Sequence, residues 1–126
     1  MPEIRIITNN PMAESWYVEK SEFICSGAKG VLIRARDLIH LGAKLVGHPL
    51  SGSVLPGVNP YKSLILAAPE KEGPAAFDLN SLNLIENAIS LLQEAPDGFK
   101  GYDEKALESF MVLDADLLES AMKTLL

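Results

Sequence analysis

Hydrophobic residues in the first quarter of the chain fall into two short runs that predict strands. Residues 4–8, Ile-Arg-Ile-Ile-Thr, are β-branched and apolar, and residues 22–25, Glu-Phe-Ile-Cys, form the second run. Between them, Asn10 is a good helix N-cap and Pro11 suits the first helical position, which predicts a short helix ending near Tyr17. A parallel pair of strands usually needs a crossover of roughly a dozen residues. The sequence therefore leaves the direction of the second strand open.

The middle of the chain contains the most regular amphipathic pattern. Over residues 30–41 apolar side chains recur at helical spacing, and Gly42 stands where a left-handed C-cap residue belongs. Residues 44–47 and 62–67 are short apolar runs that predict the third and fourth strands. A further helix follows the capping candidates that start at Asp78, and it stops before a Pro-Asp-Gly turn.

The last thirty residues have two interpretations. Their apolar positions roughly fit a helical period throughout, which indicates one long helix. Alternatively, Phe110–Leu113 is a short extended segment, and Asp114 caps a final helix over residues 115–126. We favour the second interpretation because Asp114 precedes a good helical run.

The predicted order is strand, short helix, strand, helix, strand, strand, helix, helix. This order indicates an α/β protein, a three-layer sandwich with a mainly parallel four-stranded sheet and a helical C-terminal third. At 126 residues the chain can bury a substantial core, and we expect residues 1–126 to form a single α/β domain. An exposed edge strand makes a homodimer plausible.

Composition narrows the classes of partner. The net charge of −6 disfavours nucleic acid and anionic membrane surfaces, which both select clustered Lys and Arg. No apolar run approaches the roughly 20 residues that span a bilayer, and the N-terminus lacks a signal-peptide pattern. Cys25 is the only cysteine, so no internal disulfide forms, and we expect Cys25 to be a small buried residue. These features together predict a cytoplasmic protein.

The candidate site lies in two loops that follow predicted strands. In sheets of this kind, ligands bind beyond the carboxyl ends of the strands. The segment Thr8-Asn9-Asn10 follows the first strand, and His48 to Ser53 follows the third, so parallel strands would place the two loops side by side. The second loop belongs to a long Gly- and Pro-rich connection, and connections of this length are usually functional or disordered.

Several groups in these loops suit a small anion, either a carboxylate or a phosphate. Ser51-Gly52-Ser53 offers successive backbone N–H groups and two hydroxyls, and Asn10 marks a helix start. Lys62 supplies a full positive charge, and Tyr61 stands beside it. The structural alternative makes Ser-Gly-Ser a simple turn, Asn10 a cap and Tyr61 a packed aromatic.

An enzymatic reading centres on His48, the best acid/base candidate. The alternative is a histidine that only holds its loop closed. Ser51 or Ser53 would need a base and an orienting acid to act as a nucleophile, and Asp78 or Asp114 serves only if the fold brings it in. Two histidines without neighbouring Cys or Asp disfavour a metal site, and His40 suits a helix C-terminus. Whether a cofactor binds is unknown from the sequence.

Three short motifs resemble the GrdX family. They are residues 6–11, Ile-Ile-Thr-Asn-Asn-Pro; residues 48–53, His-Pro-Leu-Ser-Gly-Ser; and residues 60–63, Pro-Tyr-Lys-Ser. The resemblance implies a small protein encoded with glycine, sarcosine and betaine reductase components in amino-acid-fermenting anaerobes. It implies no established activity and no catalytic residues.

The resulting hypothesis is an accessory protein of that reductase system that binds a small anion between the two loops. Two alternatives stay open. One is an enzyme of acyl or phosphoryl transfer with His48 as acid/base and Lys62 or Tyr61 on the substrate. The other is a protein-binding adaptor for the reductase components that takes no ligand.

Overall fold

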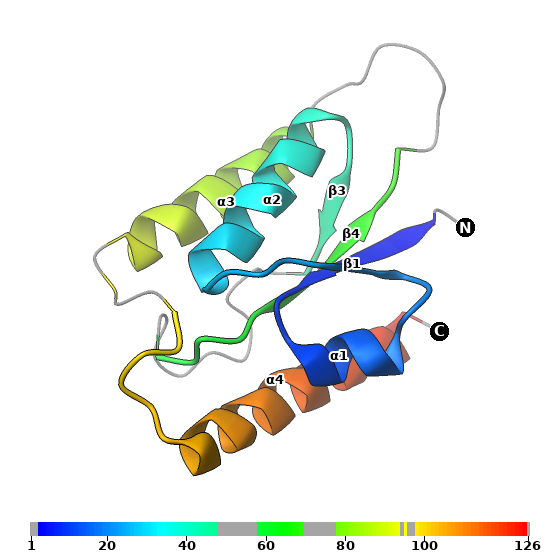
Figure 1. Cartoon of the computed structure of the whole chain (residues 1–126). Coiled ribbons are helices and arrows are strands. Elements are labelled where there is room, and N and C mark those ends of the chain that lie inside the picture. The colour runs from blue at the N-terminus through cyan, green and yellow to red at the C-terminus, as the bar shows by residue number, and fades with distance from the viewer. Residues whose placement is uncertain (1–2, 48–57, 70–77, 94, 96–97, 126) are drawn as a thin grey trace.

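The computed structural model describes residues 3–47, 58–69, 78–93, 95 and 98–125. Within these residues, strands and helices follow one another in the order that the sequence predicts (Figure 1). The strands are β1 (Ile4–Thr8), β2 (Ser21–Phe23), β3 (Lys44–Val46) and β4 (Ser63–Ala67). The helices are α1 (Pro11–Trp16), α2 (Ala28–His40), α3 (Leu79–Leu92) and α4 (Glu104–Thr124).

The sheet is mixed, so the prediction of a mainly parallel sheet is wrong. Its strand order is β2-β1-β4-β3. β1 pairs with β2 in parallel, and residues 9–20, which contain the short helix α1, make the crossover, while β4 is antiparallel to both β1 and β3. Neighbouring parallel strands usually need a helical crossover, and the sequence of residues 47–62 has no helical pattern, which agrees with the antiparallel pairing of β3 and β4.

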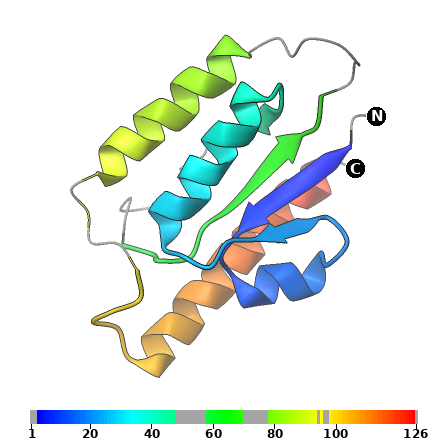
Figure 2. The ribbon, with the colours of Figure 1, turned by 45° about the horizontal axis from the view of Figure 1, so that its top comes forward.

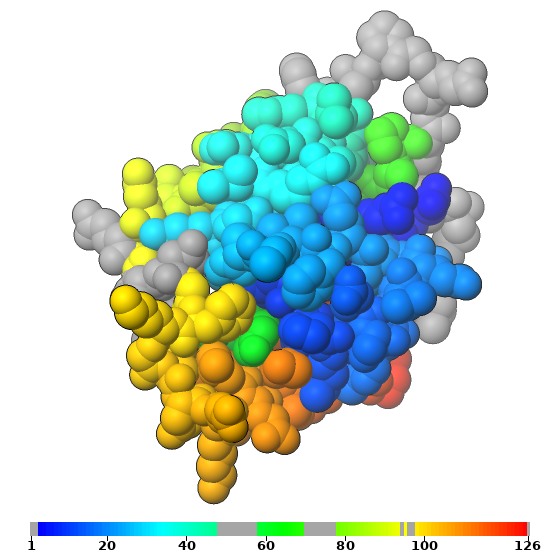
Figure 3. All heavy atoms as spheres, in the orientation of Figure 1, coloured from blue at the N-terminus to red at the C-terminus, as the bar shows by residue number. Residues whose placement is uncertain are grey.

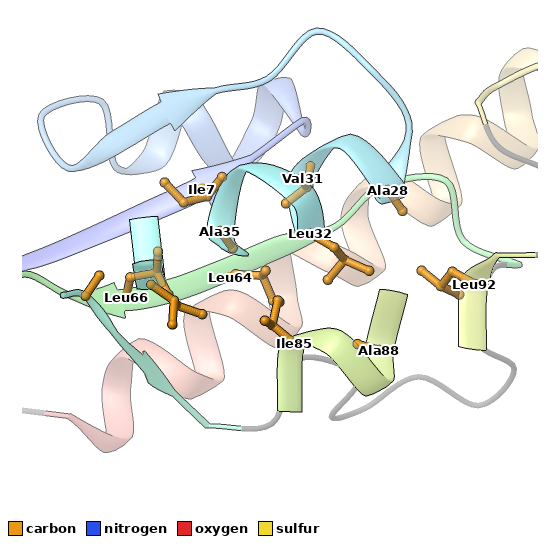
Figure 4. Packing of buried hydrophobic residues seen from close by; sticks show 12 residues of the cluster. Ile7, Ala28, Val31, Leu32, Ala35, Leu64, Leu66, Ile85, Ala88 and Leu92 are labelled. Carbon is orange, nitrogen blue, oxygen red and sulfur yellow. The ribbon is translucent and has the colours of Figure 1, made fainter. Parts of the chain in front are cut away.

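Two helices cover each face of the sheet, which gives three layers (Figures 1 and 2). Side chains alternate along β1, so Ile7 faces α2 and α3, where Leu32 and Ile85 meet it in one core (Figure 4). Ile6 faces the other side and joins Leu118 of α4 in a second core. Both isoleucines are fully buried. The three-layer architecture is confirmed.

Helix α4 corrects the interpretation of the C-terminal third. It runs without a break through residues 110–113, and the side chain of Asp103 caps it by accepting a hydrogen bond from Ala106 N. Asp114 is therefore an interior helical residue and no cap. Its carboxylate bonds to other elements, which removes the capping role that the sequence suggested.

One further expectation about burial is wrong. Cys25 is exposed, because β2 ends at Phe23 and leaves the thiol beyond the sheet. Trp16, at the end of α1, is 44% exposed as well. By contrast, Gly42 has a φ of 105°, which confirms the left-handed position after α2.

The free edge of β3 is closed by a side chain from α3. Leu45 N donates a hydrogen bond of 2.8 Å to Ser81 Oγ, and the Ser81 hydroxyl donates to the Asp78 carboxylate at the start of the helix. Ser81 is only 1% exposed. An edge N–H that is already bonded cannot pair with another chain, so this contact protects the edge.

We predict that Ser81→Ala lowers the free energy of unfolding by about 1–2 kcal/mol, because Leu45 N–H loses its partner. Urea denaturation followed by circular dichroism measures the change. Ser90→Ala, an exposed serine on the same helix, is the matched control and should be neutral or slightly stabilising. Equal effects of the two substitutions would show that the edge contact contributes nothing.

Candidate functional site

Polar side chains gather where β1 ends, β4 begins and α4 crosses the sheet. Thr8 and Ser63 are direct partners in the register of β1 and β4, two residues beyond the buried pair Ile6 and Ile65. Because alternation keeps register partners on one face, both hydroxyls point toward α4. The Thr8 and Ser63 hydroxyl oxygens are 2.7 Å apart.

Asp114 of α4 lies over this pair of hydroxyls. Its Oδ2 accepts hydrogen bonds from Ser63 Oγ at 2.7 Å and from Asn10 Nδ2 at 3.0 Å. Since the Ser63 proton goes to the carboxylate, Ser63 Oγ accepts from Thr8, and Thr8 Oγ1 in turn accepts from Asn10 N at 3.0 Å. The hydrogens donated by Asn10 N, Thr8 Oγ1 and Ser63 Oγ therefore form one directed series that ends at the carboxylate of Asp114.

Burial shifts the pKa of Asp114. The residue is 7% exposed, and loss of solvation raises the pKa of its carboxyl. The hydrogen bonds from Ser63 and Asn10 and the charge of Lys62 act in the opposite direction. Oδ1 receives no hydrogen bond from the residues that the structure describes, and no enclosed side-chain oxygen among them lacks a partner, so Oδ1 reaches solvent.

Lys62 is the cation of this region. It is partly buried, and loss of solvation lowers the pKa of its ammonium, while the charge of Asp114 opposes that change. In the described part of the chain its ammonium makes no hydrogen bond and no ion pair. The segment that leads into β4 reaches the surface between the N-terminal part and α4, as green atoms between blue and orange in Figure 3.

The side chain of Asn9 fastens the segment before β4. Its two amide hydrogens go to the carbonyls of Ser26 and Pro60, each at 2.9 Å, and its Oδ1 accepts from Lys62 N at 2.8 Å. No amide hydrogen is left to donate to an anion. Asn9 therefore positions Lys62 through the backbone.

Asn10 is used in the same way. Its amide hydrogens go to Asp114 and to the carbonyl of Met111, and its Oδ1 accepts from Met12 N as the cap of α1. The capping prediction is confirmed. Because both amide hydrogens are engaged, the side chain serves as a bridge between α1 and α4.

Tyr61 lies beside Lys62 and packs as an aromatic. It is 8% exposed, and its ring centroid is 5.0 Å from that of Phe99. Burial raises the pKa of its hydroxyl. This environment suits the packing interpretation from the sequence.

The other predicted site residues, His48, Ser51, Gly52 and Ser53, lie outside the described residues. β1 and β3 both run antiparallel to β4, so both strands finish at the same end of the sheet, with β4 between them.

The remaining candidates from the sequence lie on helices. Asp78 lies at the N-cap of α3, and His40 lies in the last turn of α2. Over the described ranges, no three His, Cys, Asp or Glu side chains group to hold a metal ion.

Ser63 is the member that sequence reasoning missed as a site residue, and Asp114 was named only as an acid that could orient a base if the fold brought it in. Ser63 could have been found from the sequence, because Thr8 and Ser63 are polar residues at the ends of two apolar strands that pair. Asp114 had no local signal of this kind, because its partners lie 51 and 104 residues away.

Comparison with known proteins identifies the family. The family model described as GrdX-like protein matches residues 5–123 of the 126-residue chain. The chain belongs to the GrdX-like protein family. The resemblance seen in the three sequence motifs is thus confirmed. No curated protein and no solved structure shows a significant match.

In the described part of this GrdX-like chain, no helix is both long and apolar enough to cross a membrane.

We predict that Asp114→Ala destabilises the fold by about 1–3 kcal/mol, because the Asn10 amide and the Ser63 hydroxyl both lose their acceptor. Asp114→Asn keeps an acceptor oxygen and should cost clearly less. Urea denaturation at neutral pH measures both. A loss for Asp114→Asn as large as for Asp114→Ala would contradict the hydrogen-bonding account.

The raised pKa of Asp114 also predicts a pH dependence. The folded state binds this proton more tightly than the unfolded state, so the contribution of Asp114 to stability is full below the ordinary Asp pKa of about 4 and is lost as pH rises through the raised value. Relative to the wild type, Asp114→Asn should therefore gain stability between about pH 4 and neutrality. The exposed Asp116→Asn is the control, and parallel curves for Asp114→Asn and wild type would contradict the assignment.

Proposed function

We propose that this GrdX-like protein binds a small anion, a carboxylate or a phosphate, at the end of the sheet where β1 and β3 finish. The observation that carries the proposal is the Lys62 ammonium, which is partly buried and has no ion-pair or hydrogen-bond partner among the described residues. A cation removed from water without a partner loses solvation that an anionic ligand restores.

The backbone that carries the Lys62 ammonium is held in place. Asn9 holds the Lys62 backbone from both sides, since Lys62 N donates to Asn9 Oδ1 and Lys62 O accepts from Asn9 N at 3.3 Å. A cation on a fixed backbone loses less conformational entropy when it binds a ligand. In this proposal His48, Ser51, Gly52 and Ser53, which follow β3 in the sequence, add further donors.

The biological setting of the proposal is an accessory role in the glycine, sarcosine and betaine reductase system. It rests on family membership together with the context that the GrdX resemblance implies. The substrates of such a system are small carboxylates, and its product is an acyl phosphate. An anion site built around one lysine suits molecules of this size.

We expect acetate, phosphate or acetyl phosphate to raise the melting temperature of the purified protein at constant ionic strength. An anion at one hundred times its dissociation constant adds about 2.7 kcal/mol to stability. Differential scanning fluorimetry gives the shift, and calorimetry gives the affinity.

Lys62→Met should abolish the response, whereas Lys105→Met should keep it. Lys105 is an exposed lysine in the first turn of α4, so both variants lose one positive charge. The proposal fails if none of the three anions binds the wild type, or if both variants respond equally.

A further inference from the structure

An unpaired cation and an unpaired carboxylate oxygen lie near each other in this site without forming an ion pair. The charges of Lys62 and Asp114 influence each other, yet the two side chains make no ion pair among the described residues. Loss of solvation disfavours the charge on each of them. Each would be stabilised by an opposite charge from a ligand.

The network around Asp114 holds its carboxylate in place. Asn10 and Ser63 both bind Oδ2, so the carboxylate cannot turn without breaking a hydrogen bond. Oδ1 is the oxygen that reaches solvent. Asn9 fixes the backbone of Lys62, which sets where the lysine side chain starts. The framework therefore holds the carboxylate itself and the backbone that carries the ammonium.

A ligand with only one charge does not fit this pair well. A simple anion on Lys62 gains from the ammonium but is repelled by the carboxylate of Asp114. A simple cation on Asp114 meets the reverse situation. A zwitterion with its carboxylate and ammonium a few atoms apart satisfies both groups and adds no net charge to a partly buried site.

We infer that the ligand is a small zwitterionic amino acid, with its carboxylate on Lys62 and its ammonium donating to Asp114 Oδ1. This inference rests on the proposed anion site and adds the second half of the ligand. The carboxylate of Asp114 recognises the ammonium of the ligand, and the ammonium of Lys62 recognises its carboxylate. Asn10, Ser63 and Thr8 are positioning residues that aim Oδ1.

The experiment compares three probes on the full chain at neutral pH by isothermal titration calorimetry. Glycine carries both charges, acetate only the carboxylate and methylamine only the ammonium. We expect glycine to bind about tenfold tighter than acetate, the order of one charge-assisted hydrogen bond, and methylamine, which lacks the carboxylate, to bind more weakly than glycine as well. N,N,N-trimethylglycine, which has no N–H to donate, should lose most of the advantage of glycine.

Asp114→Asn tests the role of the carboxylate directly. It should weaken glycine toward the affinity of acetate while leaving acetate unchanged or slightly tighter, since the repelling charge is gone. Loss of structure would weaken both probes together, so this opposite response separates recognition from folding. The exposed Asp116→Asn should leave both affinities as in the wild type.

The outcomes distinguish the two levels of the proposal. If acetate binds through Lys62 but glycine binds no tighter, the anion site stands and the zwitterion inference is overturned. Equal weakening of glycine and acetate by Asp114→Asn also overturns it. If neither acetate nor glycine binds the wild type, the anion site itself is absent. The comparison of probes on the wild type decides the inference even if Asp114→Asn does not fold.

Discussion

A carboxylate that is taken out of water must be hydrogen-bonded, and Asp114 imposes this requirement on the structure around it. Its partners come from the segment after β1 and from the start of β4, through Asn10 and Ser63. The bond from Thr8 to Ser63 joins those two strands at the same point. These hydrogen bonds tie α4 to the sheet at the point where β1 ends and β4 begins. Leu118 of the same helix adds apolar burial in the second core.

The same requirement shapes the candidate site. Because Oδ2 is held by two donors, the direction of Oδ1 is fixed, and because Asn9 binds the backbone of Lys62, the base of that side chain is fixed as well. Two opposite charges are thus brought near each other but not into contact. A fold selected for stability alone would gain by pairing or removing them. Separate, under-solvated charges on rigid supports are what a polar ligand site requires.

The sequence predicted the elements well because each depends on local periodicity. The stripe in α2 and the β-branched runs of β1 and β4 show their structure within a few residues. Strand direction is different, since it depends on which strand lies beside which. β4 inserts between β1 and β3, and no local pattern in the sequence records that choice. Likewise Asp114 looks like a cap in the sequence, because a buried acid in a helix and an N-cap are the same residue type before distant partners are known.

The site was only partly predictable for a related reason. An asparagine after a strand suits an anion, a helix cap or a bridge between elements equally well, and only its partners distinguish these roles. Asn9 and Asn10 use every amide hydrogen inside the fold, so their contribution is to hold other groups in place. Lys62 differs from them, because its ammonium forms no hydrogen bond and no ion pair within the described part of the fold. A polar residue near a strand end is thus best judged by the hydrogen-bonding groups that the fold leaves unused, and by that criterion the ammonium of Lys62 and Oδ1 of Asp114 define the candidate site.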